Sequence, residues 1–96
     1  MLLETLHSKR DIIAAAGKEF GARRIRVFGS VARGEETTES DIDFLVDLPS
    51  GYDLFAQRLP LEERLVEITG RQVDLVPEHE LNRHLRSYVL AEAVEL

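Results

Sequence analysis

The sequence contains no cysteine. This absence excludes a disulfide framework and any metal site built from thiolates. The histidines offer no substitute, because His7, His79 and His84 do not have the spacing of metal ligands. We expect them to be ordinary surface or helix residues.

The sequence also lacks long apolar runs and an excess of basic residues. No run approaches the roughly 20 apolar residues of a membrane span, and the N-terminus lacks the apolar segment of a secretion signal. We therefore expect a cytoplasmic protein without a membrane anchor. The chain has 12 Lys and Arg against 18 Asp and Glu, a net charge of −6. Nucleic-acid binding normally needs a basic surface, so we expect no direct contact with DNA or RNA.

The 96 residues are enough for one small domain, and they contain no repeat or linker. Apolar spacing predicts a helix over residues 1–20 that stops at Gly21, and a helix over 53–69 that Pro60 kinks or divides. Strands are expected at 25–28, 42–47 and 73–76. A short helix is expected at 31–34, and a last helix runs from residue 81 to nearly 96. The near-continuous apolar strand at 42–47 predicts burial on both of its faces. The order is α-β-α-β-α-β-α, typical of the α/β class.

The most informative segment is Gly29-Ser30-Val31-Ala32-Arg33-Gly34, which directly follows the first strand. A strand that ends in Gly-Ser presents free backbone N–H groups at the start of the next helical turn, where a phosphate can bind. Arg33 lies inside this segment and could steady the phosphates. Taken alone, Gly29-Ser30 could equally be an ordinary turn. The segment is not a Walker sequence, because Glu35-Glu36 follows it in place of Lys-Ser or Lys-Thr.

Two aspartates open the second strand, within Ser40-Asp41-Ile42-Asp43. Residues i and i+2 of a strand point to the same face, with Cα atoms about 6.6–6.8 Å apart. Such carboxylates repel each other unless a cation lies between them, and oxygen ligands favour magnesium. Asp74 joins them if the third strand lies beside the second. Alternatively, Asp41 is a strand-end cap and Asp74 faces solvent on an edge strand.

Together the two motifs predict a magnesium–nucleotide site. The backbone N–H groups near Gly29 and Ser30, and the Ser30 hydroxyl, would hold the β- and γ-phosphates. Asp41 and Asp43 would hold metal against those phosphates. Asp74 would help to bind a second ion and would draw a proton from the attacking hydroxyl. Three carboxylates can hold two ions about 3.5–4 Å apart, the arrangement used for in-line nucleotidyl transfer.

The motifs Gly29-Ser30, Arg33-Gly34, Ser40-Asp41-Ile42-Asp43 and the later Asp74 resemble the DNA polymerase β-like nucleotidyltransferase superfamily. Within it, the chain is most similar to the minimal nucleotidyltransferases, the MntA-type antitoxins paired with HEPN toxins. The resemblance implies one nucleotidyltransferase domain over residues 1–96, with a small α+β fold and a short mixed sheet of three to four strands. Pro60 departs from the uninterrupted helix expected of the family.

The resemblance further implies an enzyme that uses ATP and magnesium, with Asp41, Asp43 and Asp74 as metal ligands. In this family the product is often an adenylylated tyrosine on the HEPN toxin, a ribonuclease that is thereby silenced. The residues themselves favour a macromolecular acceptor, because little chain is left to enclose a small substrate. Apolar residues of the Pro60-interrupted helix and of the last helix are candidates for the contact surface. Two alternatives stay open: an antitoxin that acts only by binding, and transfer to a small molecule.

Overall fold

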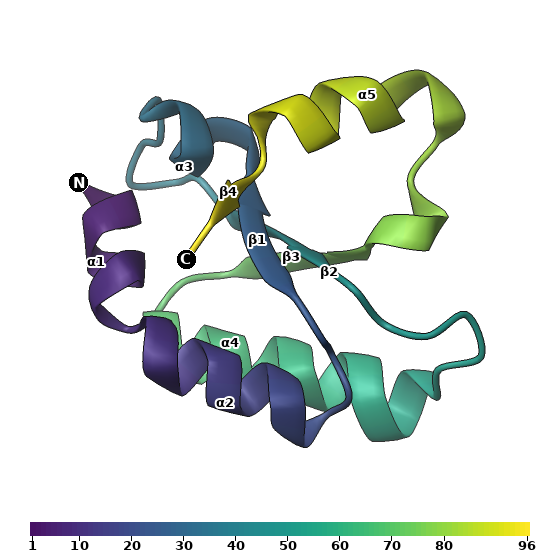
Figure 1. The fold of residues 1–96 in the computed structure, drawn as a ribbon. Helices are drawn as coiled ribbons and strands as arrows, with labels where there is room; N and C mark the ends of the chain where they lie inside the picture. The colour runs from purple at the N-terminus through teal and green to yellow at the C-terminus, as the bar shows by residue number, and fades with distance from the viewer.

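The computed structural model describes residues 1–96 and contains a four-stranded sheet with helices around it (Figure 1). The helices are α1 (Leu2–Ser8), α2 (Arg10–Glu19), α3 (Gly29–Arg33), α4 (Leu59–Thr69) and α5 (Arg83–Glu92). The strands are β1 (Ile25–Phe28), β2 (Ile42–Val46), β3 (Val73–Pro77) and β4 (Val94–Glu95). A π-helical turn over Leu54–Arg58 and a 3₁₀ turn over Glu78–Glu80 complete the chain. None of the helices is both long enough and apolar enough to cross a membrane.

The sheet is mixed, with strand order β3-β2-β1-β4. β2 runs parallel to β3, whereas β1 is antiparallel to both β2 and β4. The mixed sheet predicted from the family resemblance is therefore confirmed. The apolar run of β2 also behaves as predicted, because Phe44, Leu45 and Val46 on both of its faces are fully buried.

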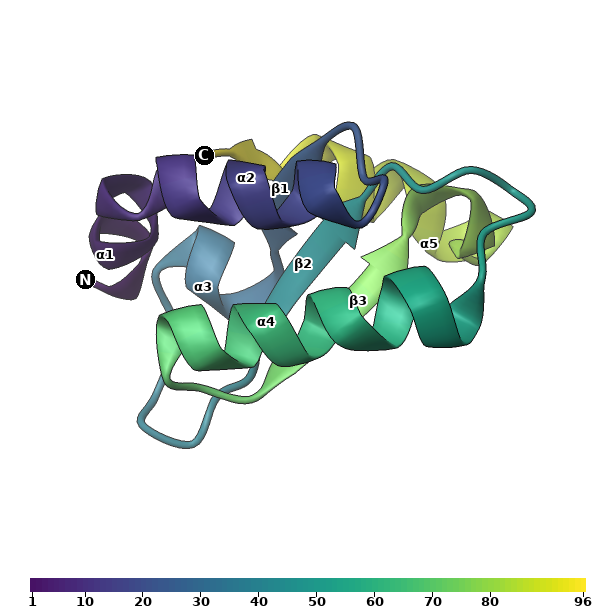
Figure 2. The same cartoon turned by 90° about the horizontal axis from the view of Figure 1, so that it is seen from below.

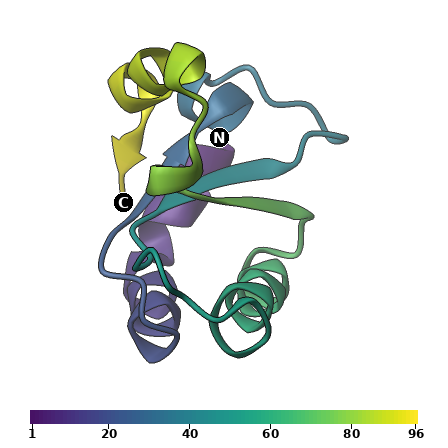
Figure 3. The same cartoon turned by 90° about the vertical axis from the view of Figure 1, so that its right-hand side faces the viewer.

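The hydrophobic core lies between the sheet and the helices α2 and α4, which cover the same face (Figures 2 and 3). Ile13 of α2 and Leu61 and Leu65 of α4 pack there against Phe44 and Leu75 of the sheet. Full burial of one such side chain contributes about 1.5–3 kcal/mol to folding. This packed layer gives the strand ends, where the candidate site lies, a fixed support.

The helix predicted over residues 1–20 is wrong in one respect, because it is divided into α1 and α2 at Lys9. Lys9 leaves the helical conformation with φ −103° and ψ 11°, and its ammonium group donates to the carbonyl of Ile68 at 2.8 Å. Both pieces bury an apolar residue, Leu6 in α1 and Ile13 in α2. Tertiary packing at the bend thus overrides the continuous helical pattern.

The predicted interruption at Pro60 is confirmed. The π-helical turn over Leu54–Arg58 ends just before α4, in which Pro60 is the second residue. Pro60 lies where the π-helical turn passes into the start of α4, the part of an α-helix in which proline is best tolerated. The Asp53 carboxylate caps the π-helical turn by accepting from the N–H groups of Phe55 and Ala56, both at 2.9 Å.

The helix predicted from residue 81 to nearly 96 is too long at both ends. It begins at Arg83, because Asn82 caps it by accepting from the N–H of His84 at 2.8 Å. It ends at Glu92, and the following residues form β4, in which Val94 lies opposite Val27 of β1. Pairing with the otherwise free edge of β1 satisfies backbone groups that a longer helix would leave open on the sheet.

The face of the sheet opposite the core buries a charge. Arg26 of β1 is only 7% exposed, and its Nη2 donates to Glu78 Oε1 at 2.5 Å. Its Nε has no hydrogen-bond partner. Glu78→Ala would leave the guanidinium buried without a counterion. We expect the free energy of unfolding, measured by urea denaturation, to fall by about 2–4 kcal/mol.

The matched control for this substitution is Glu67→Ala, at an exposed position of α4. A change at such a surface position is expected to stay within about 0.5 kcal/mol. Equal effects of the two substitutions would show that the ion pair does not stabilise this face of the sheet.

Candidate active site

The candidate residues lie where three strands meet at one end of the sheet. Phe28, the last residue of β1, is opposite Asp43 of β2, and Asp43 is opposite Asp74 of β3. Neighbouring strands are about 4.8 Å apart, so the two aspartates stand side by side. Gly29 follows Phe28 directly and opens α3. The sheet thus places the Gly-Ser segment next to the pair of strands that carry the aspartates.

Gly29 is in direct contact with the acidic strand. Its φ of +74° lies in the left-handed region, and a Cβ added there would stand 2.2 Å from Asp43 Oδ2. A side chain at this position would therefore collide with the carboxylate as well as strain the backbone. Glycine is required so that the turn into α3 can pass close to Asp43. Ser30 is the second residue of α3 and is half-buried.

The three carboxylates share this end of the sheet but differ in exposure. Asp43 is half-buried, whereas Asp41 and Asp74 are exposed. Partial burial raises the pKa of Asp43 to about 6, and the negative charges of Asp74 and Asp41 add to the rise. A bound cation would relieve this repulsion, so the donor set fits magnesium. The side chains do not converge as a preformed centre of three ligands.

The raised pKa of Asp43 predicts a pH dependence of stability in metal-free buffer. Because the folded state holds this proton more tightly than the unfolded chain, the contribution of Asp43 to stability is fully present below about pH 4 and is lost as pH rises to about 6. Because solvent screens this half-exposed side chain, we expect the free energy of unfolding to fall by only about 1 kcal/mol over this pH range. Asp43→Asn is therefore expected to be about 1 kcal/mol more stable than the natural protein at pH 7.5 and nearly equal at pH 4. Urea denaturation at both pH values tests this, and a destabilised variant at pH 7.5 would contradict it.

Arg33 lies at the end of α3 and is held by two carboxylates. Its Nε donates to Glu35 Oε1 at 2.9 Å, and its Nη1 donates to Glu92 Oε1 at 2.5 Å. Glu92 is the last residue of α5, and its other oxygen accepts from the N–H of Gly29 at 2.9 Å. Burial opposes ionisation of Glu92, but the hydrogen bonds from Arg33 and Gly29 outweigh it and lower the pKa. Glu92 thus joins the last helix to the Gly-Ser segment.

Two residues near the site, Glu92 and Arg71, were not among those predicted from the sequence. Arg71 Nη1 donates to the carbonyl oxygens of Thr37 and Ser40, at 3.0 and 3.1 Å. These bonds fix the acidic loop that leads into Asp41. Both contacts join segments more than 30 positions apart, so no local pattern could have revealed them.

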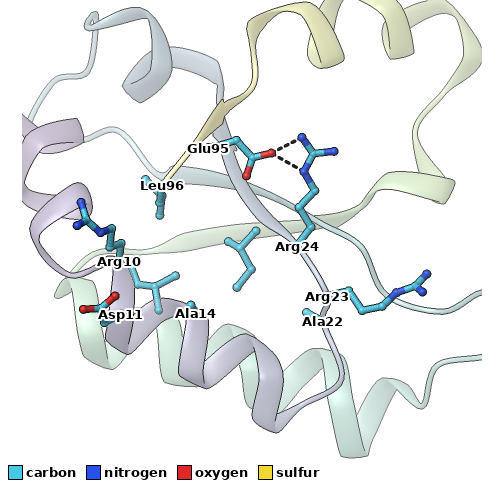
Figure 4. Close-up of a pocket in the computed structure, with 10 residues that line it drawn as sticks. Arg10, Asp11, Ala14, Ala22, Arg23, Arg24, Glu95 and Leu96 are labelled. Carbon is cyan, nitrogen blue, oxygen red and sulfur yellow. Dashed lines mark hydrogen bonds and ion pairs between the residues drawn. The ribbon is translucent and has the colours of Figure 1, made fainter.

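The carboxylate end of the sheet is an open surface. None of the cavities is lined by Gly29, Asp43 or Asp74. A hollow of about 430 Å³ reaches Asp41 from the side, between the acidic loop and the start of β3. A smaller hollow of about 290 Å³ lies far along the sheet, between α2 and β4 (Figure 4), where Arg24 pairs with Glu95. Its charged lining is thus partly neutralised, and it contains none of the candidate residues.

Residues 9–96 match the model of the nucleotidyltransferase domain family. The chain belongs to this family, and the class predicted from its motifs is confirmed. It is similar to the protein adenylyltransferase MntA of Thermococcus cleftensis, with 40% identity over 98 residues that cover 98% of each chain.

Solved structures agree with this assignment. A structure described as a minimal nucleotidyltransferase superposes with a TM-score of 0.86 and 43% identity, over 100% of this chain and 97% of the other. A crystal structure of a toxin–antitoxin with AMP-PNP superposes with a TM-score of 0.74 and 25% identity, over 88% of this chain and 69% of the other. The protein is therefore a nucleotidyltransferase of the minimal type.

Proposed function

We propose that this protein is an antitoxin that transfers AMP from ATP to a tyrosine hydroxyl of a partner HEPN ribonuclease toxin and so silences it. The observation that carries the proposal is the contact between the Gly-Ser turn and the acidic strand, with Gly29 against Asp43 and Asp43 beside Asp74. The similarity to an MntA protein adenylyltransferase and to a toxin–antitoxin crystallised with AMP-PNP supports it.

In this proposal the start of α3 binds the triphosphate. The N–H groups of Gly29 and Ser30 and the Ser30 hydroxyl donate to the β- and γ-phosphates, and Arg33 contributes a positive charge. These donors need no large movement of the backbone, because the glycine conformation already brings the turn against the acidic strand. Fixed donors lower the cost of arranging the phosphates for reaction.

The aspartates Asp41, Asp43 and Asp74 would hold magnesium, as two ions. When bound, magnesium supplies positive charge that offsets the charge on the phosphates and on the pyrophosphate leaving group. Asp74 is exposed and accepts the proton of the attacking hydroxyl. The hydroxyl oxygen forms a bond to the α-phosphorus, the α–β phosphoanhydride bond breaks, and pyrophosphate leaves.

A macromolecular acceptor fits the open site. No cavity encloses Asp43 or Asp74, so the protein cannot bury a small acceptor there as most small-molecule sites do. Apolar side chains for partner contact are exposed in two places: Phe55 is 78% exposed, and Leu85 and Tyr88 of α5 are 57% and 75% exposed. These residues lie on the helices that the sequence had suggested as a contact surface.

The exposed apolar residues also favour a second candidate, an antitoxin that neutralises the toxin by binding alone. They belong to other elements than the acidic residues, so a complex could form without catalysis. A small-molecule acceptor remains the third candidate, and it requires product formation in the absence of any partner protein.

The position of the label in ATP tests the proposed reaction. The protein is incubated with magnesium, a HEPN partner and ATP labelled on either the α- or the γ-phosphate. Adenylyl transfer predicts a labelled partner with α-labelled ATP and no label with γ-labelled ATP. Label from the γ-phosphate would show phosphoryl transfer, and label in neither case with a stable complex would favour the binding antitoxin.

A further inference from the structure

We propose that Glu92 competes with the nucleotide triphosphate for the donors of α3, and so sets the affinity of the site for ATP. This inference rests on the proposed function, in which Gly29 and Arg33 bind phosphates. It assigns to the last helix a direct influence on nucleotide binding.

Glu92 already engages the donors as a phosphate would. One carboxylate oxygen accepts from the N–H of Gly29 at 2.9 Å, and the other accepts from Arg33 Nη1 at 2.5 Å. The carboxylate therefore bridges the backbone donor and the charged donor of the same short helix. The Gly29 N–H has a single hydrogen, so Glu92 and a phosphate oxygen cannot both accept from it with good geometry.

Glu92 also places a negative charge where the triphosphate would come. The carboxylate lies beside Gly29, the residue that also lies against Asp43, so its charge stands at the turn where the phosphates would bind and would repel them. A triphosphate that approached with Glu92 in place would meet this repulsion as well as blocked donors. Binding therefore requires the carboxylate to leave both donors.

The Glu92 side chain can leave its two donors without breaking core packing. No residue of α5 is fully buried, and the helix lies on the side of the sheet away from α2 and α4 (Figure 3). Apart from Glu92, its contact with the body includes the bond from Arg86 Nη1 to the Glu78 carbonyl at 3.1 Å. Displacing Glu92 thus breaks surface contacts rather than core packing, and this permits an exchange between carboxylate and phosphate.

The test is the affinity of Glu92→Gln for AMP-PNP with magnesium, measured by isothermal titration calorimetry. Glutamine keeps the shape but loses the charge that pairs with Arg33, so the triphosphate displaces it more easily. We expect AMP-PNP to bind about five- to twentyfold tighter than to the natural protein. The affinity for inorganic tripolyphosphate is expected to rise by a similar factor. The affinity for AMP, which has no β- or γ-phosphate, is expected to change by about twofold at most.

Glu35→Gln is the matched control, because it removes the same charge and the other partner of Arg33 but leaves the Gly29 N–H untouched. We expect it to change AMP-PNP affinity by about twofold or less. If Glu92→Gln binds AMP-PNP no tighter than Glu35→Gln does, competition is refuted while the proposed function stands. Weaker binding by Glu92→Gln would likewise refute it, by making Glu92 part of the binding machinery. Failure of the natural protein to bind AMP-PNP would overturn the proposed function and this inference together.

Discussion

Substitution of both Asp41 and Asp43 by Asn is expected to abolish AMP transfer while the protein stays folded. The loss should reach roughly 10³-fold or more in the initial rate with α-labelled ATP, since the variant lacks the charges that would hold magnesium against the phosphates. Asn is close to Asp in shape, and loss of the Asp43 charge removes its repulsion from Asp74. Thermal melting followed by circular dichroism checks that the fold is intact.

The control for the double substitution is Asp47→Asn, because Asp47 follows the other end of β2, where it pairs with Arg23 at 3.6 Å. This variant is expected to keep the transfer rate.

The same variants separate catalysis from binding in cells that express the toxin. Loss of neutralisation in the Asp41/Asp43 variant supports the enzyme, whereas full neutralisation would favour the antitoxin that acts by binding.

Gly29→Ala is expected to lower the transfer rate by at least about tenfold, because the added Cβ would lie 2.2 Å from Asp43 Oδ2 and must push the carboxylate or the turn away. The left-handed φ of +74° adds backbone strain. We expect a loss of about 1–3 kcal/mol in the free energy of unfolding. Rates are compared at a temperature where circular dichroism shows the variant to be folded.

Gly70→Ala provides a matched control for the backbone strain. Gly70 ends α4 with φ +71°, and a Cβ added there meets no atom within 4 Å. Its substitution should therefore cost similar stability but leave the transfer rate nearly unchanged. Equal losses of activity in the two variants would show that the contact between Gly29 and Asp43 has no special role in the reaction.

The parts of the fold that were predictable are those with a strong local pattern. The apolar run 42–47 indicated a buried strand, and β2 is buried on both faces. Asp74 stood out as the polar residue in an apolar strand, and the parallel pairing of β2 with β3 does place it beside Asp43. Pro60 correctly marked the division between the π-helical turn and α4.

What the sequence did not reveal depends on contacts between distant segments. The bend at Lys9 has no proline or glycine to signal it and follows from packing of both helices on the core. The segment 94–95 was predicted as the end of the last helix, and only its pairing with the free edge of β1 makes it a strand. Glu92 contacts Gly29, which lies 63 positions earlier in the chain. Glu92 is the last residue of α5, whereas the apolar pattern predicted that this helix ends later. A single sequence gives no sign of such contacts.

Asp43 illustrates how a metal site of the kind proposed lowers the stability of the metal-free fold. Its partial burial and the negative charges of Asp74 and Asp41 disfavour its charge, and this raises its pKa to about 6. The arrangement destabilises the metal-free fold but concentrates negative charge where a cation would bind. Addition of magnesium is therefore expected to stabilise the natural protein more than the Asp43→Asn variant.

The central claim is that this protein adenylylates a partner toxin, and the intact mass of that partner tests it most directly. A HEPN partner is incubated with the protein, magnesium and ATP, and its mass is measured by mass spectrometry. We predict a gain of one or more AMP units, located on a tyrosine by peptide mapping and absent with the Asp41/Asp43 variant. An unchanged mass of a partner that nevertheless forms a stable, neutralised complex would contradict the account.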